Sequence, residues 1–226
     1  MELTILGSGG PIPHPRRNGS GTALSLGNDV VLVDCGPGIT DELVDAGIHP
    51  AGIERLFFTH HHMDHNAEFF TFAISSWILG RRSLTLYGPP GTQRLVDAIS
   101  SVYEKDFEYR ASLGRSLAGL ADIDTKQVSD GFTFEGDGWR VRALAVDHSI
   151  TAYAYRFEET TTGSSVVLSG DTRKLPEMAE FASGADVLVH ECPFGPQREL
   201  SPDEPIWNEY VDPSREGGFH AELDAV

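Results

Sequence analysis

Three consecutive histidines, an aspartate and a fourth histidine are crowded into positions 60–65, directly after the apolar segment 53–58. The apolar segment is typical of a buried strand, so the polar run begins where a strand ends. Successive side chains of an extended backbone point to opposite faces, and His60, His62 and Asp64 should therefore share one side. A solvated histidine-rich turn is the competing interpretation, but the spacing H-x-H-x-D-H favours a metal site.

His65 begins the following helix and should reach the same place from a different backbone direction. His61 has the wrong parity, and we leave it out of the site. Imidazole and carboxylate donors suit zinc, and also manganese or iron. Four donors from one loop exceed what a single tetrahedral ion with an open position takes, so we expect two metal ions.

Two later strand ends offer further donors. The apolar residues 143–146 lead into Asp147-His148, and the residues 165–168 lead into Ser169-Gly170-Asp171. Open α/β sheets build their sites at the carboxyl ends of strands. We therefore expect His148 and Asp171 to complete the metal site.

Strands and helices follow one another in both halves of the chain, which predicts one compact α/β domain over residues 1–226 with two similar halves. Helices are expected over residues 39–47, 65–79, 89–103 and 174–183. Strands are expected over residues 3–6, 22–26, 30–34, 53–58, 83–87, 132–134, 139–146, 152–157, 166–169 and 185–190, the last of them buried. Residues 111–126 are less periodic and are expected to form a connector or lid.

Acidic residues outnumber basic ones by 34 to 17, for a net charge of −17. Proteins that bind nucleic acid usually present a basic face that neutralises phosphates. The expected place for such a face is an exposed cluster of Arg16, Arg17, Arg81 and Arg82. The charge therefore favours a small ester-type substrate and makes nucleic acid an improbable partner.

Hydrophobic residues make up 40% of the chain, as in globular proteins, and no apolar run approaches the roughly 20 residues of a membrane span. The first residues lack the basic leader of a secretory signal. The two cysteines, Cys35 and Cys192, suit a reduced compartment. We expect a cytoplasmic protein without a membrane partner, and a homodimer is compatible with these features.

The set of motifs resembles the metallo-β-lactamase superfamily of dinuclear hydrolases, and it is most similar to the ribonuclease Z and arylsulfatase-like branch. The motifs that carry this resemblance are LGSGG at 6–10, PRRN at 15–18, VDCG at 33–36, HHHMDH at 60–65, SGDT at 169–172 and LVHEC at 188–192. Together they cover about residues 1–195.

The resemblance implies a four-layer αββα sandwich with the metals at one edge of the two sheets. One ion would be held by His60, His62 and His148, the second by Asp64 and His65, and Asp171 would bridge them. Asp34 would brace the histidine loop. A metal-bridging hydroxide, oriented by Asp64, would attack the substrate. The candidates for protonating the leaving group are His190, Glu191 and His220.

The resemblance leaves three functions open. The first is hydrolysis of a phosphodiester, a sulfate ester or a lactone; the second is tRNA 3′ processing; the third is a non-catalytic metal-binding or scaffold protein. Ribonuclease Z enzymes carry a long Lys-rich arm that this sequence lacks, and D-C-G is followed here by Pro37-Gly38-Ile39-Thr40. Their final histidine ligand has no counterpart before Val226. We therefore expect the terminal helix, strand and histidine of the family to be missing from this sequence.

Overall fold

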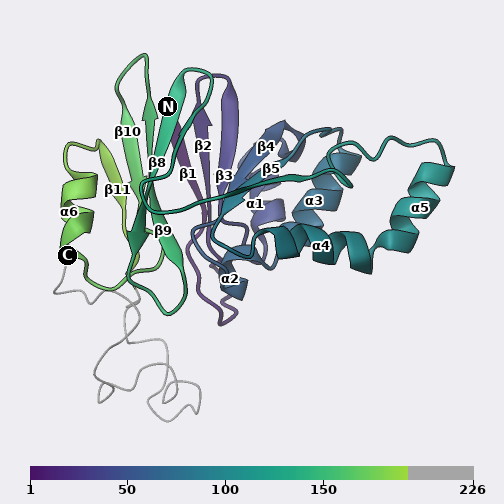
Figure 1. Ribbon diagram of the computed structural model, residues 1–226, viewed down its shortest axis with the longest axis horizontal. Coiled ribbons are helices and arrows are strands. Elements are labelled where there is room, and N and C mark those ends of the chain that lie inside the picture. The colour runs from purple at the N-terminus through teal and green to yellow at the C-terminus, as the bar shows by residue number, and fades with distance from the viewer. Residues whose placement is uncertain (193–226) are drawn as a thin grey trace, which may run out of the picture.

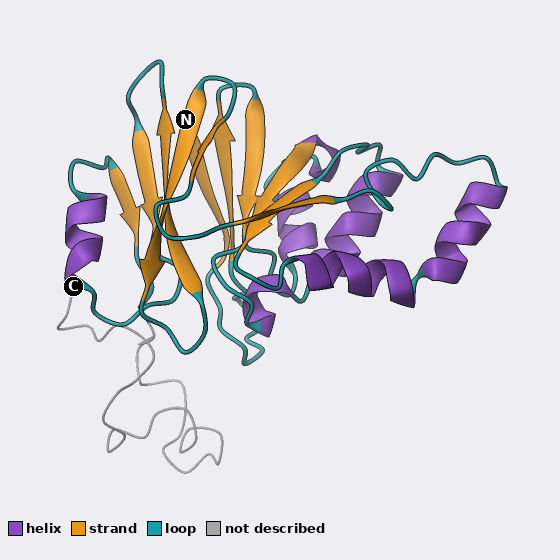
Figure 2. Cartoon of the chain, in the orientation of Figure 1, coloured by secondary structure: helices purple, strands orange, loops and turns teal. Residues whose placement is uncertain are grey.

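The structure, a computed structural model, describes residues 1–192. Two β-sheets pack face to face, and helices cover the outer side of each sheet (Figures 1 and 2). The layers follow in the order α, β, β, α. This confirms the sandwich that the sequence predicts. His220 and the expected absence of a terminal helix and strand fall outside the described residues, and the single-domain assignment of residues 1–226 stays a prediction.

The first sheet comes from the N-terminal half of the chain. Its strands, in spatial order, are β1 (Glu2–Gly7), β2 (Gly21–Leu26), β3 (Asp29–Val33), β4 (Ile53–Phe57), β5 (Thr85–Gly88) and β6 (Asp124–Gln127). The first three are antiparallel neighbours, and β3 to β6 run parallel. Parallel strands bring their carboxyl ends to one edge, so the residues after β3 and after β4 lie side by side.

The second sheet comes from the later part of the described chain. In spatial order its strands are β11 (Val187–Val189), β10 (Ser165–Leu168), β9 (Ala152–Glu159), β8 (Trp139–Val146) and β7 (Thr133–Glu135). The pairs are antiparallel except β10 with β11. The carboxyl ends of β8 and β10 therefore lie at one edge of this sheet, next to the carboxyl ends of β3 and β4 (Figure 1).

The helices complete the outer layers. They are α1 (Ile39–Asp45), the 3₁₀ turn η1 (Pro50–Gly52), α2 (Met63–Asn66), α3 (Phe69–Ile78), α4 (Gln93–Val102), α5 (Glu104–Ser112) and α6 (Pro176–Ala182). In Figure 1, α6 covers the second sheet and the other helices lie on the side of the first sheet. Within residues 1–192, none of these helices has the length and apolar character that a membrane crossing requires.

Aromatic rings fill the space between the two sheets. The ring of Phe57 stacks on Tyr87 at 4.4 Å between centroids, and it meets Phe157 edge-on at 5.3 Å. Trp139 and Tyr155 complete this buried cluster. Burying one large apolar side chain is worth roughly 1.5–3 kcal/mol, so this cluster fixes how the two halves face each other.

Three expectations for the local structure were wrong. The helix expected over 65–79 is two helices, because the backbone N–H of Glu68 donates to the carbonyl of Cys35 at 3.0 Å and the chain turns between α2 and α3. The strand expected to be buried over 185–190 is short and largely exposed. The stretch 111–126 contains the end of α5 and the edge strand β6 rather than only a connector.

Arg81 was also expected to be exposed, and it is buried with only 1% of its surface accessible. Its guanidinium donates to the carbonyls of Ala73, Ser83 and Gly119 and to the hydroxyl of Ser76, over 2.7–3.0 Å. Burial lowers its pKa to about 10, so it stays charged at neutral pH. Arg81 thus joins the end of α3 to the chain before β6, and it cannot contribute to a basic face.

We expect Arg81→Met to destabilise the fold by about 3 kcal/mol, because four acceptors, three of them in buried hydrogen bonds, lose their donor. Urea unfolding followed by circular dichroism measures this change. Arg115→Met is the matched control, since Arg115 is exposed, and its effect should stay within about 0.5 kcal/mol. Equal stability of the two variants would contradict the structural role of Arg81.

Candidate metal centre

The histidine-rich run lies at the edge where both sheets present their carboxyl ends. His62, in an extended conformation, immediately precedes α2, and the short helix carries Asp64 and His65. Two loops hold this helix through its backbone. Ser20 donates its N–H to the carbonyl of Asp64 at 2.9 Å, and Cys35 donates to the carbonyl of His65 at 2.7 Å. The loops after β1 and β3 therefore position the polar run.

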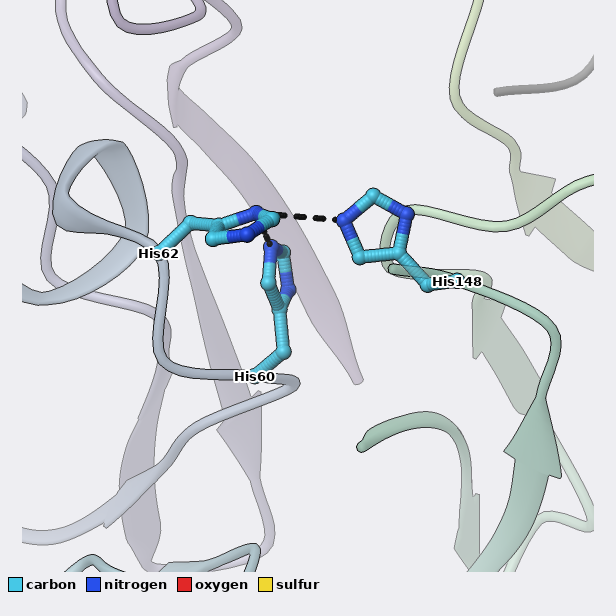
Figure 3. A group of neighbouring side chains, drawn as sticks. All are labelled: His60, His62 and His148. Atoms are coloured by element: carbon cyan, nitrogen blue, oxygen red, sulfur yellow. Dashed lines mark hydrogen bonds between the residues drawn. The ribbon is translucent and has the colours of Figure 1, made fainter. Parts of the chain in front are cut away.

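The structure brings the sequence-predicted donors into two groups of three. The groups are His60 with His62 and His148, and His60 with His65 and Asp171, and within each group the ligand atoms lie within 4.8 Å of one another. In the first group, Nδ1 of His62 lies 3.1 Å from Nε2 of His60 and 3.1 Å from Nε2 of His148. Figure 3 shows these three rings meeting, with His148 approaching from the opposite side.

The second group adds carboxylates to imidazoles. Nε2 of His65 lies 3.4 Å from a carboxylate oxygen of Asp171 and 3.7 Å from one of Asp64. The other carboxylate oxygen of Asp171 lies 4.0 Å from Nε2 of His60. Asp171 therefore lies between His65 and His60, the residue that both groups share, and Asp64 borders the second group.

The hydrogen bonds of Thr59 determine which nitrogen of His60 faces the centre. The hydroxyl of Thr59 has one proton, and the carboxylate of Asp34 at 2.8 Å can only accept. The hydroxyl must then accept from Nδ1–H of His60 at 3.0 Å. This leaves the lone pair on Nε2 of His60 pointing into the donor group.

Asp34 is the shared acceptor behind both groups. Its carboxylate accepts from the backbone N–H of Thr59 at 2.8 Å, from the hydroxyl of the same residue, and from Nδ1–H of His65 at 2.7 Å. It is 2% exposed, and its backbone adopts the left-handed region with φ 61°. Such outer hydrogen bonds orient metal-binding histidines, as the resemblance implies for this aspartate.

His62 has an analogous outer partner. Its Nδ1 faces His60 and His148, and its Nε2 lies 3.3 Å from the hydroxyl of Ser149. Neither Ser149 nor Thr59 is predicted from the sequence, since no motif marks a lone hydroxyl residue. Their one signal is position, because each stands next to a candidate ligand.

The two groups differ in the charge they favour. Burial, together with the neighbouring His65, lowers the pKa of His60 to about 2, so this ring is neutral. Burial works in the same direction on His65, but the charge of Asp34 and the hydrogen bonds to Asp171 and Asp34 outweigh it and raise the pKa to about 10. Burial also lowers the pKa of His62. The first group thus contains the neutral ring of His60 and the weakly basic ring of His62, whereas the second contains the cationic ring of His65.

The proposed proton donors lie beside the loop that carries Asp171. The carboxylate of Glu191 accepts from the backbone N–H of Thr172 at 2.8 Å, and its own N–H donates to the hydroxyl of Ser169 at 3.0 Å. Nδ1 of His190 lies 2.8 Å from the carbonyl of Glu191. This places both residues next to the second group, whereas their role in proton transfer stays a prediction.

The comparisons with known proteins agree with this geometry. The family described as Anti-Pycsar protein Apyc1 matches residues 1–200 of the chain. The ribonuclease Z of Mycobacterium marinum is 37% identical over 194 residues, which are 84% of this chain and 70% of that protein.

Two solved structures share the fold. Human tRNase Z, short form, has a TM-score of 0.72 at 21% identity and covers 100% of this chain and 85% of its own. The metallo-β-lactamase fold protein YhfI from Bacillus subtilis has a TM-score of 0.68 at 20% identity, with 85% and 70% covered. Identities this low show the fold, and the relatives above show the family. The chain therefore belongs to the metallo-β-lactamase superfamily of metal-dependent hydrolases, as a relative of ribonuclease Z within the Anti-Pycsar protein Apyc1 family.

Proposed function

We propose that the chain is a metal-dependent phosphodiesterase that cleaves RNA, in the manner of its ribonuclease Z relatives. The observation that carries this proposal is the 37% identity to the ribonuclease Z of Mycobacterium marinum over 84% of the chain. The net charge of the sequence favours a small ester over nucleic acid as the substrate. The ribonuclease Z relatives favour RNA instead. RNA processing, held above as the alternative, is the better supported function.

The donor sets fit two first-row metal ions, of which we propose zinc. The three imidazoles of His60, His62 and His148, whose ligand atoms lie within 4.8 Å of one another, suit zinc, with manganese and iron as alternatives. His60, His62 and His148 would hold the first ion. Asp64 and His65 would hold the second, with Asp171 between the two. When bound, the ions would supply Lewis acidity and an activated water for attack at phosphorus.

The chain's own residues supply the remaining steps. Asp64 is proposed to orient the attacking water, because its carboxylate lies 3.7 Å from Nε2 of His65, beside Gly10 of the loop after β1. His190 and Glu191 are proposed to deliver the proton to the leaving oxygen, since they flank the loop of Asp171. His220 keeps the same proposed role and lies outside the described residues.

A local basic loop supports RNA as the substrate. The loop between β1 and β2 carries Arg16 and Arg17, both exposed, and it is held to itself by a 2.7 Å hydrogen bond from Gly9 N–H to the carbonyl of Asn18. A Cβ on Gly10 of this loop would lie 3.9 Å from the carboxylate of Asp64. The loop that carries these two arginines therefore also reaches Asp64, and arginine contacts with phosphate contribute to the affinity for RNA.

The second candidate is hydrolysis of a small phosphodiester, sulfate ester or lactone, and the net charge of −17 favours it. A purely non-catalytic role loses support, because all six expected donors meet at one edge and the chain belongs to a hydrolase superfamily. We further propose a cytoplasmic location, which suits the two free thiols of Cys35 and Cys192. A homodimer stays a prediction.

We expect the purified protein to hold close to two equivalents of a transition metal after reconstitution, and His148→Ala to weaken binding by more than about 100-fold. Losing a direct ligand should exceed the roughly 10–100-fold effect of an outer partner. Zinc titration against a competing chelator measures the affinity. A wild-type protein that retains less than half an equivalent of any transition metal would overturn the metal assignment.

Asp34→Asn should weaken zinc binding by roughly 10–100-fold, because the neutral amide no longer holds Nδ1–H of His65 and the Thr59 hydroxyl together. Ser20→Ala is the control, since its hydroxyl lies at the edge of the same carboxylate at 3.4 Å. The same chelator competition reports both variants. Equal loss in the two variants would mean that the carboxylate of Asp34 has no special role.

The test of substrate class compares a precursor tRNA carrying a 3′ trailer with an aryl phosphodiester. We expect zinc-loaded protein to trim the RNA, with kcat/KM falling steeply with salt. Replacing Arg16 and Arg17 by Gln should lower kcat/KM for RNA about tenfold and leave the aryl phosphodiester unaffected. Cleavage of the aryl ester without any trimming of RNA would favour the small-ester candidate.

A further inference from the structure

The second histidine of the run, His61, is excluded from both donor groups and makes a different set of contacts. Its ring lies against Phe58, with 5.6 Å between centroids. Its Nε2 lies 2.9 Å from the hydroxyl of Thr92, and its Nδ1 lies 3.3 Å from the side-chain amide nitrogen of Asn66. Each ring nitrogen of His61 therefore has a polar side-chain partner, and the backbone of Pro89 is a further one.

The proton positions follow from the partners. The hydroxyl of Thr92 donates its single proton to the carbonyl of Pro89 at 2.8 Å, because a carbonyl can only accept. The same hydroxyl must then accept from Nε2–H of His61. A neutral ring with its proton on Nε2 has a lone pair on Nδ1, which accepts from the amide of Asn66. One assignment satisfies all three hydrogen bonds.

These bonds connect two separate parts of the chain through His61. Thr92 is buried and belongs to the turn between β5 and α4, whereas Asn66 is the last residue of α2, the helix that carries Asp64 and His65. Residues 58–62 between β4 and α2 have no regular secondary structure. A side-chain bridge can fix such a segment where a ladder of backbone bonds does not.

We propose that His61 is a positioning residue that clamps the metal-binding loop between the β5–α4 turn and α2. The clamp holds His60 and His62, its two neighbours, at the separation that the first metal position needs. It also restrains the end of α2 relative to them. The inference rests on the proposed metal-binding function. It assigns a positioning role to His61, the one histidine of the run that belongs to neither donor group.

A double-mutant cycle tests the clamp. His61→Phe keeps the ring against Phe58 and removes both nitrogens, and Thr92→Val removes the hydroxyl at nearly constant shape. Each variant should weaken zinc binding about tenfold in a chelator competition, the lower end of the range for an outer partner. Either substitution breaks the same bridge between His61 and Thr92. The double variant should therefore lose no more zinc affinity than each single variant, about tenfold relative to the wild type.

Two further variants separate positioning from general stability. Thr92→Ser keeps the hydroxyl and should restore the zinc affinity of the wild type. Thr125→Val is the matched control, because it also removes a threonine hydroxyl bonded to α4, at 2.6 Å from Gln93, on the exposed side. Its zinc affinity should equal that of the wild type, and urea unfolding of each metal-free variant shows whether affinity and stability change separately.

The outcomes distinguish this inference from the proposed function. A wild-type protein that binds no zinc would defeat the proposed function. A wild-type protein that binds zinc, with His61→Phe and Thr92→Val binding equally tightly, would defeat the clamp alone. Additive losses near 100-fold in the double variant would also defeat it, since the two residues would then act independently.

Discussion

The carboxylate of Asp34 is the group on which the arrangement of the candidate centre depends. It accepts hydrogen bonds from the backbone N–H and the hydroxyl of Thr59 and from Nδ1–H of His65. A single charge therefore orients donors from both groups. Among residues 1–192, Asp34 is also the one residue other than glycine with positive φ. A backbone conformation of this kind costs of order 1–3 kcal/mol and persists where surrounding contacts over-determine it. Here those contacts are the hydrogen bonds of its own side chain.

The second sheet is joined to the same loop by direct bonds, which explains why His148 and Asp171 arrive at the correct edge. The N–H of Tyr153 donates to the carbonyl of Thr59 at 3.0 Å, and the hydroxyl of Tyr155 donates to the carbonyl of Phe58 at 2.8 Å. Both tyrosines belong to β9, between the strands that lead to the two later donors. The aromatic layer sets the distance between the sheets. These two hydrogen bonds hold β9 next to the loop that follows β4.

Local patterns predict the donor set and an α/β domain, and the resemblance to the superfamily implies the sandwich. Strand parity separates His60 and His62 from His61, and strand ends point to His148 and Asp171. The break between α2 and α3 escapes prediction, because the bond from Glu68 to Cys35 joins residues 33 positions apart. The burial of Arg81 escapes for the same reason, since one of its acceptors is the carbonyl of Gly119, 38 positions away. Long-range partners of this kind leave no periodic trace in a sequence.

The unequal charge of the two donor groups has a consequence for how the centre fills. In the metal-free protein the raised pKa keeps a proton on His65 between Asp34 and Asp171, and this proton partly offsets the charge of the two carboxylates. An arriving divalent ion must displace that proton, so filling the second position is an exchange of one cation for another. The centre should behave as a small ion exchanger, taking up metal more readily as the surroundings become less acidic.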